Sequence, residues 1–274
     1  MKSASLIIST YNNTKFLKPV LLSAFLQETK NLNEIIIIDD GSKAETLSLI
    51  SEMSVQSPFK IIHVWHPDNG FRLAEIRNKG ARESTGDILI FIDGDMCLEK
   101  NFVEDHIFVS NDNLFLQGSR IRLGPKITEK IASSGAFKAP SIFSHDIANR
   151  IYVIRSKILS KLHRTKKGHT RGIRGCNISV PKVLFEKVNG FDSRFVGWGR
   201  EDNEFVARLL NAGADRRDIK NLALAFHLYH IEVERESLKT NDTLLNNTID
   251  GKLTYSVDGV LEAVNYTKTI FEAR

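Results

Sequence analysis

Cysteine is scarce in this chain of 274 residues, which carries only Cys97 and Cys176. Two cysteines exclude a scaffold held together by disulfides and are typical of a reducing compartment. No apolar run approaches the ~18 residues that a membrane-spanning helix needs. The first residues lead into a strand-like segment and show no leader-peptide pattern. We therefore expect a cytoplasmic protein, with the inner face of the cell membrane as a place where it could work.

Two patterns of nucleotide-binding and nucleic-acid-binding proteins are also absent. No Gly-x-Gly-x-x-Gly follows a predicted strand, which disfavours a dehydrogenase. The net charge is only +5 and no nucleic-acid-binding motif accompanies it, so we expect no nucleic-acid partner. The cationic residues are concentrated between Arg155 and Arg174, where eight Lys or Arg residues occur without an acid. This block predicts either a solvated helical face or a surface that docks on phosphates or on an anionic membrane.

What the chain does have is an alternation of strand and helix patterns over its first ~95 residues. Apolar, β-branched runs predict strands at 6–8, 34–38, 60–65 and 87–92, and helical spacing predicts helices at 16–27, 46–53 and 73–83. This order predicts an α/β fold with a mostly parallel sheet and helices on both of its faces.

The second half is less regular. The patterns predict helices at 101–109, 181–188 and 202–212, and strands at 114–122, 177–180 and 222–226. Residues 126–171 match neither period, and the polar tail from Glu232 is expected to be partly helical. We expect a single domain, with a first half at 1–124, a second at 125–231 and a tail at 232–274.

Polar residues follow three of the predicted strands. They are Thr10-Tyr11-Asn12, Asp39-Asp40 and Asp93-Gly94-Asp95. In an open parallel sheet, ligands bind beyond the carboxyl ends of the strands. Carboxylates there can accept hydrogen bonds from a uracil ring or a ribose, and two carboxylates can hold a divalent cation against a diphosphate. An isolated Asp-Gly-Asp is more often a turn, but this one directly follows an apolar strand, which favours the metal site.

Four motifs now suggest a family. STYN at 9–12, IIIIDDGS at 35–42, GFRLAEIRN at 70–78 and GDILIFIDGD at 86–95 occur in the order found in the family 2 glycosyltransferases, which this chain resembles. The resemblance implies the GT-A fold, with 1–124 as the nucleotide-sugar-binding half. It further implies that Asp40 contacts the base, Asp93 the ribose and Asp95 the metal. The implied donor-binding residues are Thr10, Tyr11, Asn12, Asp40, Asp93 and Gly94, with Arg72 and Arg77 lining the diphosphate side of the cleft.

The second half adds a more specific resemblance. NGFD at 189–192, GWGRED at 197–202 and the strand that runs into His227 are similar to the C-terminal region of β-1,4-galactosyltransferases and bacterial chondroitin-type polymerases. The resemblance implies that Asp202 is the general base, that Glu201 contacts the acceptor and that Trp198 lies beside both sugars. Gly199 and Asn177 would also contact the acceptor. A carboxylate in this place suits the chemistry, since the attacking hydroxyl loses a proton. Asp202 and Glu201 could equally open a helix, whose first turn favours acids.

A histidine completes the metal shell in the enzymes that the chain resembles. His227 directly follows the predicted strand, which favours it for this role beside Asp95 and Asp93; His230 is the alternative. The implied cofactor is Mn²⁺ or Mg²⁺. Arg200 stands where the galactosyltransferases have glycine, which leaves the identity of the donor sugar open.

These observations predict an inverting, metal-dependent transfer of a sugar from a UDP-sugar to a hydroxyl of a glycan or lipid-linked glycan. The expected context is bacterial surface polysaccharide or lipopolysaccharide synthesis. One alternative is a nucleotidyltransferase that makes sugar nucleotides, but that class has a glycine-rich, basic loop after its first strand. Another is an inactive sugar-binding module on the same fold, which would be expected to lack one of Asp95, Asp202 and His227. All three are present.

Overall fold

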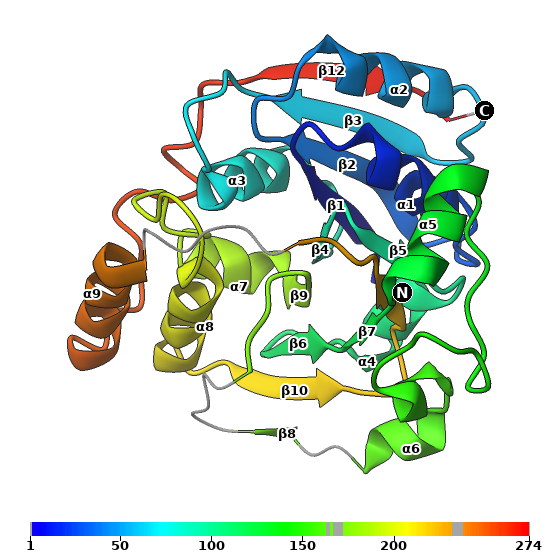
Figure 1. Ribbon diagram of the computed structural model, residues 1–274. Coiled ribbons are helices and arrows are strands. Elements are labelled where there is room, and N and C mark those ends of the chain that lie inside the picture. Colours follow the sequence, from blue (N-terminus) through cyan, green and yellow to red (C-terminus); the bar gives the residue numbers. More distant parts are fainter. Residues whose placement is uncertain (1, 163–164, 167–171, 232–237, 274) are drawn as a thin grey trace.

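The computed structural model describes residues 2–162, 165–166, 172–231 and 238–273 (Figure 1). Its strands are β1 (Ala4–Thr10), β2 (Leu32–Asp39), β3 (Lys60–Trp65), β4 (Ile88–Asp93), β5 (Met96–Leu98), β6 (Leu114–Gly118), β7 (Arg120–Arg122), β8 (Thr165–Lys166), β9 (Asn177–Pro181), β10 (Asp215–Ile219), β11 (Ala225–His227) and β12 (Thr267–Phe271). Its helices are α1 (Thr14–Phe25), α2 (Ala44–Ser54), α3 (Leu73–Glu83), α4 (Phe102–Val109), α5 (Pro125–Ser134), α6 (Lys157–Lys161), α7 (Lys182–Lys187), α8 (Glu201–Asn211) and α9 (Leu238–Asp250), with a 3-10 turn at Arg150–Val153.

One large sheet runs through the molecule in the order β12-β3-β2-β1-β4-β9-β6-β10-β8. The neighbours β3, β2, β1 and β4 are parallel, which is the arrangement that the alternating first half predicted. β9 joins β4 to β6 and is antiparallel to both. Figure 1 shows helices on both sides of this sheet. The predicted α/β fold is therefore confirmed.

Strands in the middle of the sheet are apolar on both faces because both faces are covered. Ile35 and Ile37 pack in a cluster with residues of α1 and α4. Ile36 and Ile38 point the other way, into a cluster with residues of α3, α7 and α8. The sheet thus separates two cores, and the carboxyl ends of its parallel strands lie at one edge between them.

A second, small sheet forms beside that edge. β11 pairs antiparallel with β5 and parallel with β7. The single strand expected at 114–122 is therefore two strands, because the chain leaves the main sheet at Ser119 and continues in the small one. The strand expected at 222–226 begins later, at Ala225, and includes His227. This small sheet carries the candidate metal ligands.

The strand patterns missed β10. Its sequence, Asp-Arg-Arg-Asp-Ile, has none of the apolar residues at its start that mark a strand. The structure nevertheless pairs it parallel with β6. The buried Arg216 Nε donates to Asp218 Oδ1 at 2.8 Å. Two charged residues can therefore occupy a buried strand, because the ion pair satisfies the groups that burial removes from water.

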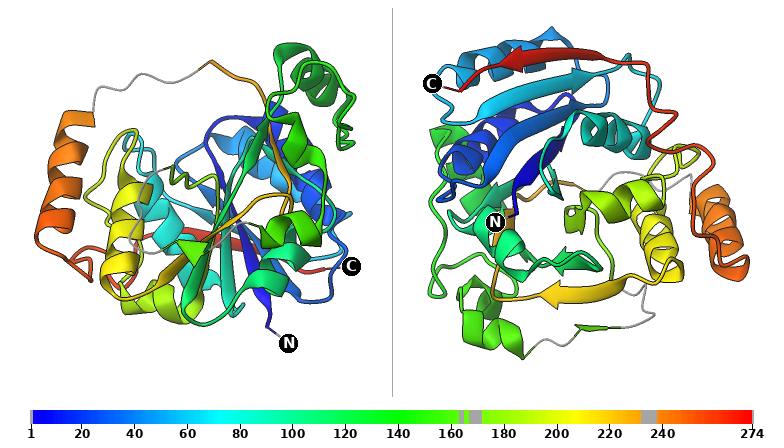
Figure 2. Two further views of the ribbon diagram at one scale, coloured as in Figure 1. Left: turned by 90° about the horizontal axis from the view of Figure 1, so that it is seen from below. Right: turned by 180° about the vertical axis from the view of Figure 1, so that it is seen from behind.

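The C-terminal tail returns to the body of the protein. Figure 2 shows α9 beside α8 in both views, and β12 along the outer edge of the sheet. The partly helical tail was predicted, but β12, which pairs antiparallel with β3, was not. In the part of the chain that the structure describes, no helix combines the length and apolar character needed to cross a membrane.

Candidate active site

The parallel register brings the predicted polar strand ends together. Ser9 pairs with Asp93 of β4, and Thr10 pairs with Asp39 of β2. The Asp40 backbone N–H also donates to the Thr10 carbonyl at 3.1 Å. Three sequence segments that are up to about eighty residues apart thus meet at one sheet edge. The meeting point places the residues expected to bind a nucleotide side by side.

A buried chain of polar groups holds Asp40. Its carboxylate accepts from His66 Nε2 at 2.7 Å and from the Arg72 backbone N–H at 2.9 Å. Lys79 Nζ donates to His66 Nδ1 at 2.8 Å and to Glu75 Oε1. Because an ammonium offers only donors, His66 Nδ1 accepts and the ring proton is on Nε2, facing Asp40. Neither His66 nor Lys79 was predicted from the sequence. The only signal was a histidine shortly after a strand.

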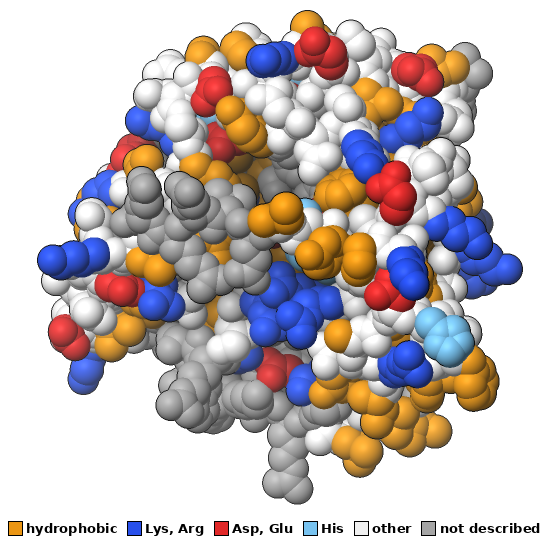
Figure 3. Space-filling model, viewed as in Figure 1, with side chains coloured by type: hydrophobic (Ala, Val, Ile, Leu, Met, Phe, Trp, Pro, Cys, Tyr) orange, Lys and Arg blue, Asp and Glu red, His pale blue; other side chains and the backbone are white. Residues whose placement is uncertain are grey.

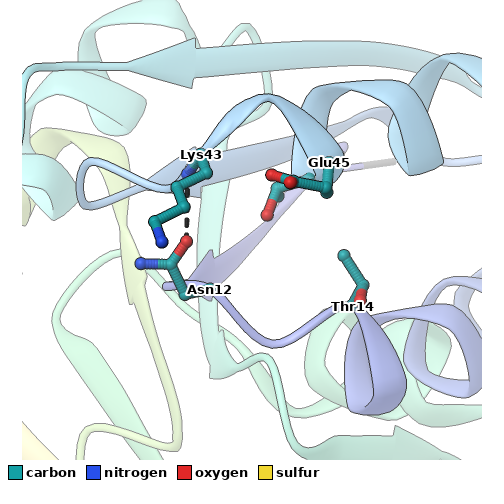
Figure 4. A pocket seen from close by; sticks show the side chains of 5 residues that line it. Asn12, Thr14, Lys43 and Glu45 are labelled. Atoms are coloured by element: carbon teal, nitrogen blue, oxygen red, sulfur yellow. Dashed lines mark hydrogen bonds between the residues drawn. The ribbon is translucent and has the colours of Figure 1, made fainter.

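Tyr11 and Asn12 form the loop after β1. The Tyr11 hydroxyl donates to Asp68 Oδ2 at 2.9 Å, and its ring is half exposed. The Asn12 side chain accepts from the Lys43 backbone N–H at 3.0 Å, at the start of α2. A cavity of about 310 Å³ opens between the beginnings of α1 and α2, with Asn12 and Lys43 on one side and Thr14 and Glu45 on the other (Figure 4). The role of these residues in donor binding stays a prediction.

Arg77 does not line an open diphosphate cleft as expected. Its side chain is only 2% exposed, and its guanidinium bridges two carboxylates, Asp93 Oδ1 at 3.2 Å and Glu201 Oε1 at 3.3 Å. It also lies over the Phe191 ring at 5.2 Å. Arg77 lies on the buried face of α3, and its long side chain reaches the two carboxylates from inside the protein. Arg77 therefore connects the first half of the chain with the second.

Three side chains form a candidate metal centre. Asp95 Oδ2 lies 2.9 Å from His230 Nε2 and 3.4 Å from His227 Nε2, and one ligand atom from each lies within 4.8 Å of the others. Asp95 Oδ1 is buried and has no hydrogen-bond partner, as expected for an oxygen that binds an ion. Carboxylate and imidazole ligands suit Mn²⁺. The residues present therefore fit a divalent cation.

Asp93 stands outside this group of ligands. Its Oδ1 accepts from Ser9 Oγ and from Arg77, and the described residues that could hold a metal are Asp95, His227 and His230. The assignment of Asp93 to the metal shell is therefore not supported. The reason is the turn at 94–95: Asp93 is still in β4 and faces Arg77, whereas Asp95 lies in the turn, where the strand direction is broken.

Backbone pairing places the three ligands. His227 pairs with Met96, the residue after Asp95, and the Leu228 N–H donates to the Asp95 carbonyl at 2.9 Å. Gly94 is required because a Cβ would lie 2.4 Å from the Ser9 carbonyl oxygen. The hydrogen bond to Asp95 raises the pKa of His230 to about 9, whereas burial lowers the pKa of His227. Both histidines therefore lie at Asp95, and which of them binds a metal stays a prediction.

The acidic pair Glu201 and Asp202 opens α8. Asp202 Oδ2 accepts from the Gly175 backbone N–H at 2.9 Å, and its Oδ1 accepts from the Asn203 N–H at 2.7 Å. Burial, and then the charge of Asp202, raise the pKa of Glu201 to about 7; burial also raises the pKa of Asp202. Glu201 Oε2 is buried without a hydrogen-bond partner. A carboxyl pair with raised pKa values is typical of proton-transfer chemistry.

The loop before α8 has an unusual backbone. Gly197, Gly199 and Arg200 have φ values of 75°, 101° and 79°. This left-handed region favours glycine, so Arg200 adopts it at a cost in backbone strain. Arg200 Nε pairs with Asp242 of α9 at 2.6 Å. Trp198 lies on this loop and is 39% exposed, as a sugar platform would be. Its sugar contacts, and those of Gly199, stay predictions.

Asn177 is the clearest disagreement with expectation. It was predicted to contact the acceptor, but its side chain is fully buried. Its Oδ1 faces His106 Nε2 at 3.1 Å, and its Nδ2 donates to the Ser119 and Ala223 carbonyls. The residue begins β9 and lies against α4 and against the segments that lead into β7 and β11. Asn177 therefore joins the two sheets and does not face a ligand.

Comparisons with known proteins agree with this architecture. Among solved structures, the crystal structure of GalNAc-T7 with UDP, GalNAc and Mn²⁺ superimposes with a TM-score of 0.67 at 15% identity, covering 92% of this chain and 50% of the other. The mannosyltransferase of Pyrobaculum calidifontis in complex with GDP-Man and Mn²⁺ gives a TM-score of 0.56 at 15% identity, covering 88% and 61%. The fold is the GT-A fold of the glycosyltransferases.

Sequence similarity identifies the family. Residues 5–177, more than half of the chain, match the model of glycosyl transferase family 2, and residues 156–231 match that of the N-terminal domain of galactosyltransferase. The chain belongs to glycosyl transferase family 2. The chondroitin synthase of Escherichia coli is 26% identical over 245 residues (81% of this chain, 34% of the relative). An uncharacterized glycosyltransferase of Bacillus subtilis strain 168 is 30% identical over 250 residues (79% and 63%). The chain spans about a third of the synthase.

Proposed function

We propose that this chain catalyses an inverting, metal-dependent transfer of a sugar from a UDP-sugar to a carbohydrate hydroxyl. One observation carries the proposal: Arg77 bridges Asp93 of the nucleotide half and Glu201 of the second half. The candidate metal group and the candidate base Asp202 thus border a single site. Solved relatives in fold were crystallised with nucleotides or nucleotide sugars and Mn²⁺, which supports the nucleotide-sugar donor and the metal.

The residues have distinct parts in this transfer. Asp202, fixed by the Gly175 and Asn203 N–H groups, accepts the proton of the attacking hydroxyl. Arg77 keeps Glu201 beside it. Asp95, His227 and His230 would hold a divalent ion, which offsets the charge on the departing diphosphate. With the base on one side of the sugar and the leaving group on the other, a single displacement inverts the anomeric carbon.

A donor panel tests the proposal. We expect Mn²⁺-dependent release of UDP, and not of GDP, when the protein is incubated with nucleotide sugars and a mixture of oligosaccharide acceptors, a choice of nucleotide supported by the UDP bound in GalNAc-T7. Formation of pyrophosphate from UTP and a sugar 1-phosphate would identify a nucleotidyltransferase instead. Saturable UDP-sugar or glycan binding with no turnover of any donor would indicate a sugar-binding module.

The acceptor is proposed to be a growing glycan, free or lipid-linked, of a bacterial surface polysaccharide. Chondroitin and hyaluronan synthases among the relatives support a polysaccharide. A surface around α6 supports a lipid-linked acceptor. Ile158 and Leu162 are 78% and 72% exposed there, and Lys157 and Lys161 flank them. Figure 3 shows hydrophobic side chains gathered over the place of α6, with cations close by. Three further cations of the predicted basic block, Arg164, Lys167 and Arg171, lie outside the described residues.

We therefore expect the protein to bind anionic vesicles through α6. The wild type should co-sediment with phosphatidylglycerol vesicles at low salt and not with phosphatidylcholine vesicles, since each lysine near such a surface contributes ~1 kcal/mol. The double variant Lys157→Glu/Lys161→Glu should lose this binding, whereas the matched control Lys30→Glu/Lys239→Glu, exposed elsewhere, should keep it. Equal loss of vesicle binding in both variants would indicate only a general effect of net charge. If the wild type does not bind anionic vesicles, the docking surface is refuted.

A further inference from the structure

The side chains of three arginines beside the candidate active site have no partner among the described residues. Arg120 and Arg122 form the two ends of β7, and Arg174 precedes Gly175 on the chain that leads into β9. Among the described residues, none of the three guanidinium groups has a hydrogen-bond acceptor or a carboxylate in contact. The Arg120 Nε is moreover shielded from solvent. A shielded, unpaired cationic donor is costly, so an anionic ligand would stabilise it.

The strand register directs two of them toward the metal ligands. β7 is parallel to β11, with Arg122 opposite His227 and Arg120 opposite Ala225. Paired residues of neighbouring strands point to the same face of a sheet. Arg120 and Arg122 therefore share a face with His227. The intervening Ile121 points the other way and is fully buried in the core.

Hydrogen bonds place Arg174 beside the segment that leads into β7. The Arg174 backbone N–H donates to Gln117 Oε1 at 3.0 Å, and Gln117 Nε2 donates to the Arg174 carbonyl at 3.1 Å. Gln117 precedes Arg120 by three residues, so Arg174 and β7 are neighbours. Figure 3 agrees, because cationic side chains gather below a hollow in the middle of the face, where Figure 1 has β7 and β9.

The position of Arg174 relates this cluster to the acceptor. The Gly175 N–H, one residue further on, donates to Asp202, the carboxylate proposed to take the acceptor proton. An anion beside Arg174 therefore lies near the attacking sugar. The donor diphosphate, in contrast, is expected at the candidate metal ligands Asp95, His227 and His230.

We infer that Arg120, Arg122 and Arg174, the arginine cluster, bind an oxyanion group of the acceptor, so that the preferred acceptor is an anionic glycan carrying a carboxylate or phosphate. The inference rests on the proposed transfer. A guanidinium matches such groups because its planar fork of N–H donors can bind two oxygens at once. With a neutral acceptor, the cluster would have no anionic partner among the residues that the structure describes.

Matched acceptors test the inference. The wild type, loaded with UDP and Mn²⁺ so that the donor site is filled, is titrated calorimetrically with an oligosaccharide ending in a uronic acid and with its carboxyl-reduced, neutral counterpart. A sugar phosphate serves as the phosphate probe. We expect one of the two anionic probes to bind at least ~10-fold tighter than the neutral one, and this preference to be lost in Arg120→Gln and in Arg174→Gln. Arg150→Gln, an exposed arginine of the 3-10 turn, is the control.

The outcomes separate the possible roles. Loss of the anion preference with unchanged UDP affinity supports the inference. A weaker affinity for UDP in both cluster variants, with all acceptors equally affected, overturns it and assigns the arginines to the donor diphosphate. Equal binding of neutral and anionic probes by the wild type also overturns it. Failure of the proposed transfer would appear differently, as no turnover of any nucleotide sugar by the wild type. Because Arg122 and Arg174 are exposed, Arg122→Gln provides a second variant with little risk to folding.

Discussion

Replacing Asp202 by Asn is expected to lower kcat by ~10²–10⁴-fold, the contribution of a positioned general base. Asn retains the size of the side chain but cannot take the proton of the attacking hydroxyl. The affinity for UDP should be unchanged, because Asp202 opens α8 and the nucleotide is expected at the ends of β1, β2 and β4. Turnover and UDP calorimetry on the same preparation measure both quantities.

The structure also shows how this experiment could mislead. Both Asp202 oxygens accept backbone N–H groups, and the Asn amide nitrogen cannot replace one of them. Thermal unfolding of the variant therefore has to be compared with that of Asp250→Asn, an exposed carboxylate at the end of α9. Joint loss of UDP binding, activity and thermal stability in Asp202→Asn alone would make Asp202 a structural residue that supports the start of α8.

Removing the candidate metal centre is expected to abolish transfer. Asp95→Ala deletes the carboxylate that both histidines approach, together with the unpartnered Oδ1. EDTA should stop the wild-type reaction, and Mn²⁺ should restore it. Mn²⁺ affinity, measured without substrate by electron paramagnetic resonance, should fall in His227→Ala and His230→Ala by at least the ~10–100-fold that loss of an outer-shell partner costs.

The control for this set is His145→Ala, an exposed histidine far along the chain from the three ligands. Its Mn²⁺ affinity and turnover should match those of the wild type. Full activity of the wild type in excess EDTA would contradict the metal-dependent mechanism. If only one of the two histidine variants loses Mn²⁺ affinity, the centre uses that histidine alone, and the other is a neighbour.

Much of the site was predictable because it follows local rules. Asp40, Asp93 and Asp95 come directly after apolar runs, and parallel strands necessarily bring such ends to one edge. Arg77 was named through the family resemblance, which implied a place in the diphosphate cleft, whereas the structure buries it between two carboxylates. Helical spacing shows that a face is buried but not which residues it contacts. Asn177 was misjudged because a polar residue at a strand end can face either a ligand or a second sheet.

Sequence alone determined the α/β class, the family, the parallel strands β1 to β4 and the identity of the groups that can do chemistry. These properties depend on residue type and on spacing within a few positions. The tertiary structure decided which groups meet: both His227 and His230 at Asp95, Arg77 between Asp93 and Glu201, and Lys79 behind His66. It also decided that the charged Asp215–Ile219 segment forms β10. These contacts join residues far apart in the chain, and pairing at such distances depends on the packing of the whole sheet, which no local pattern records.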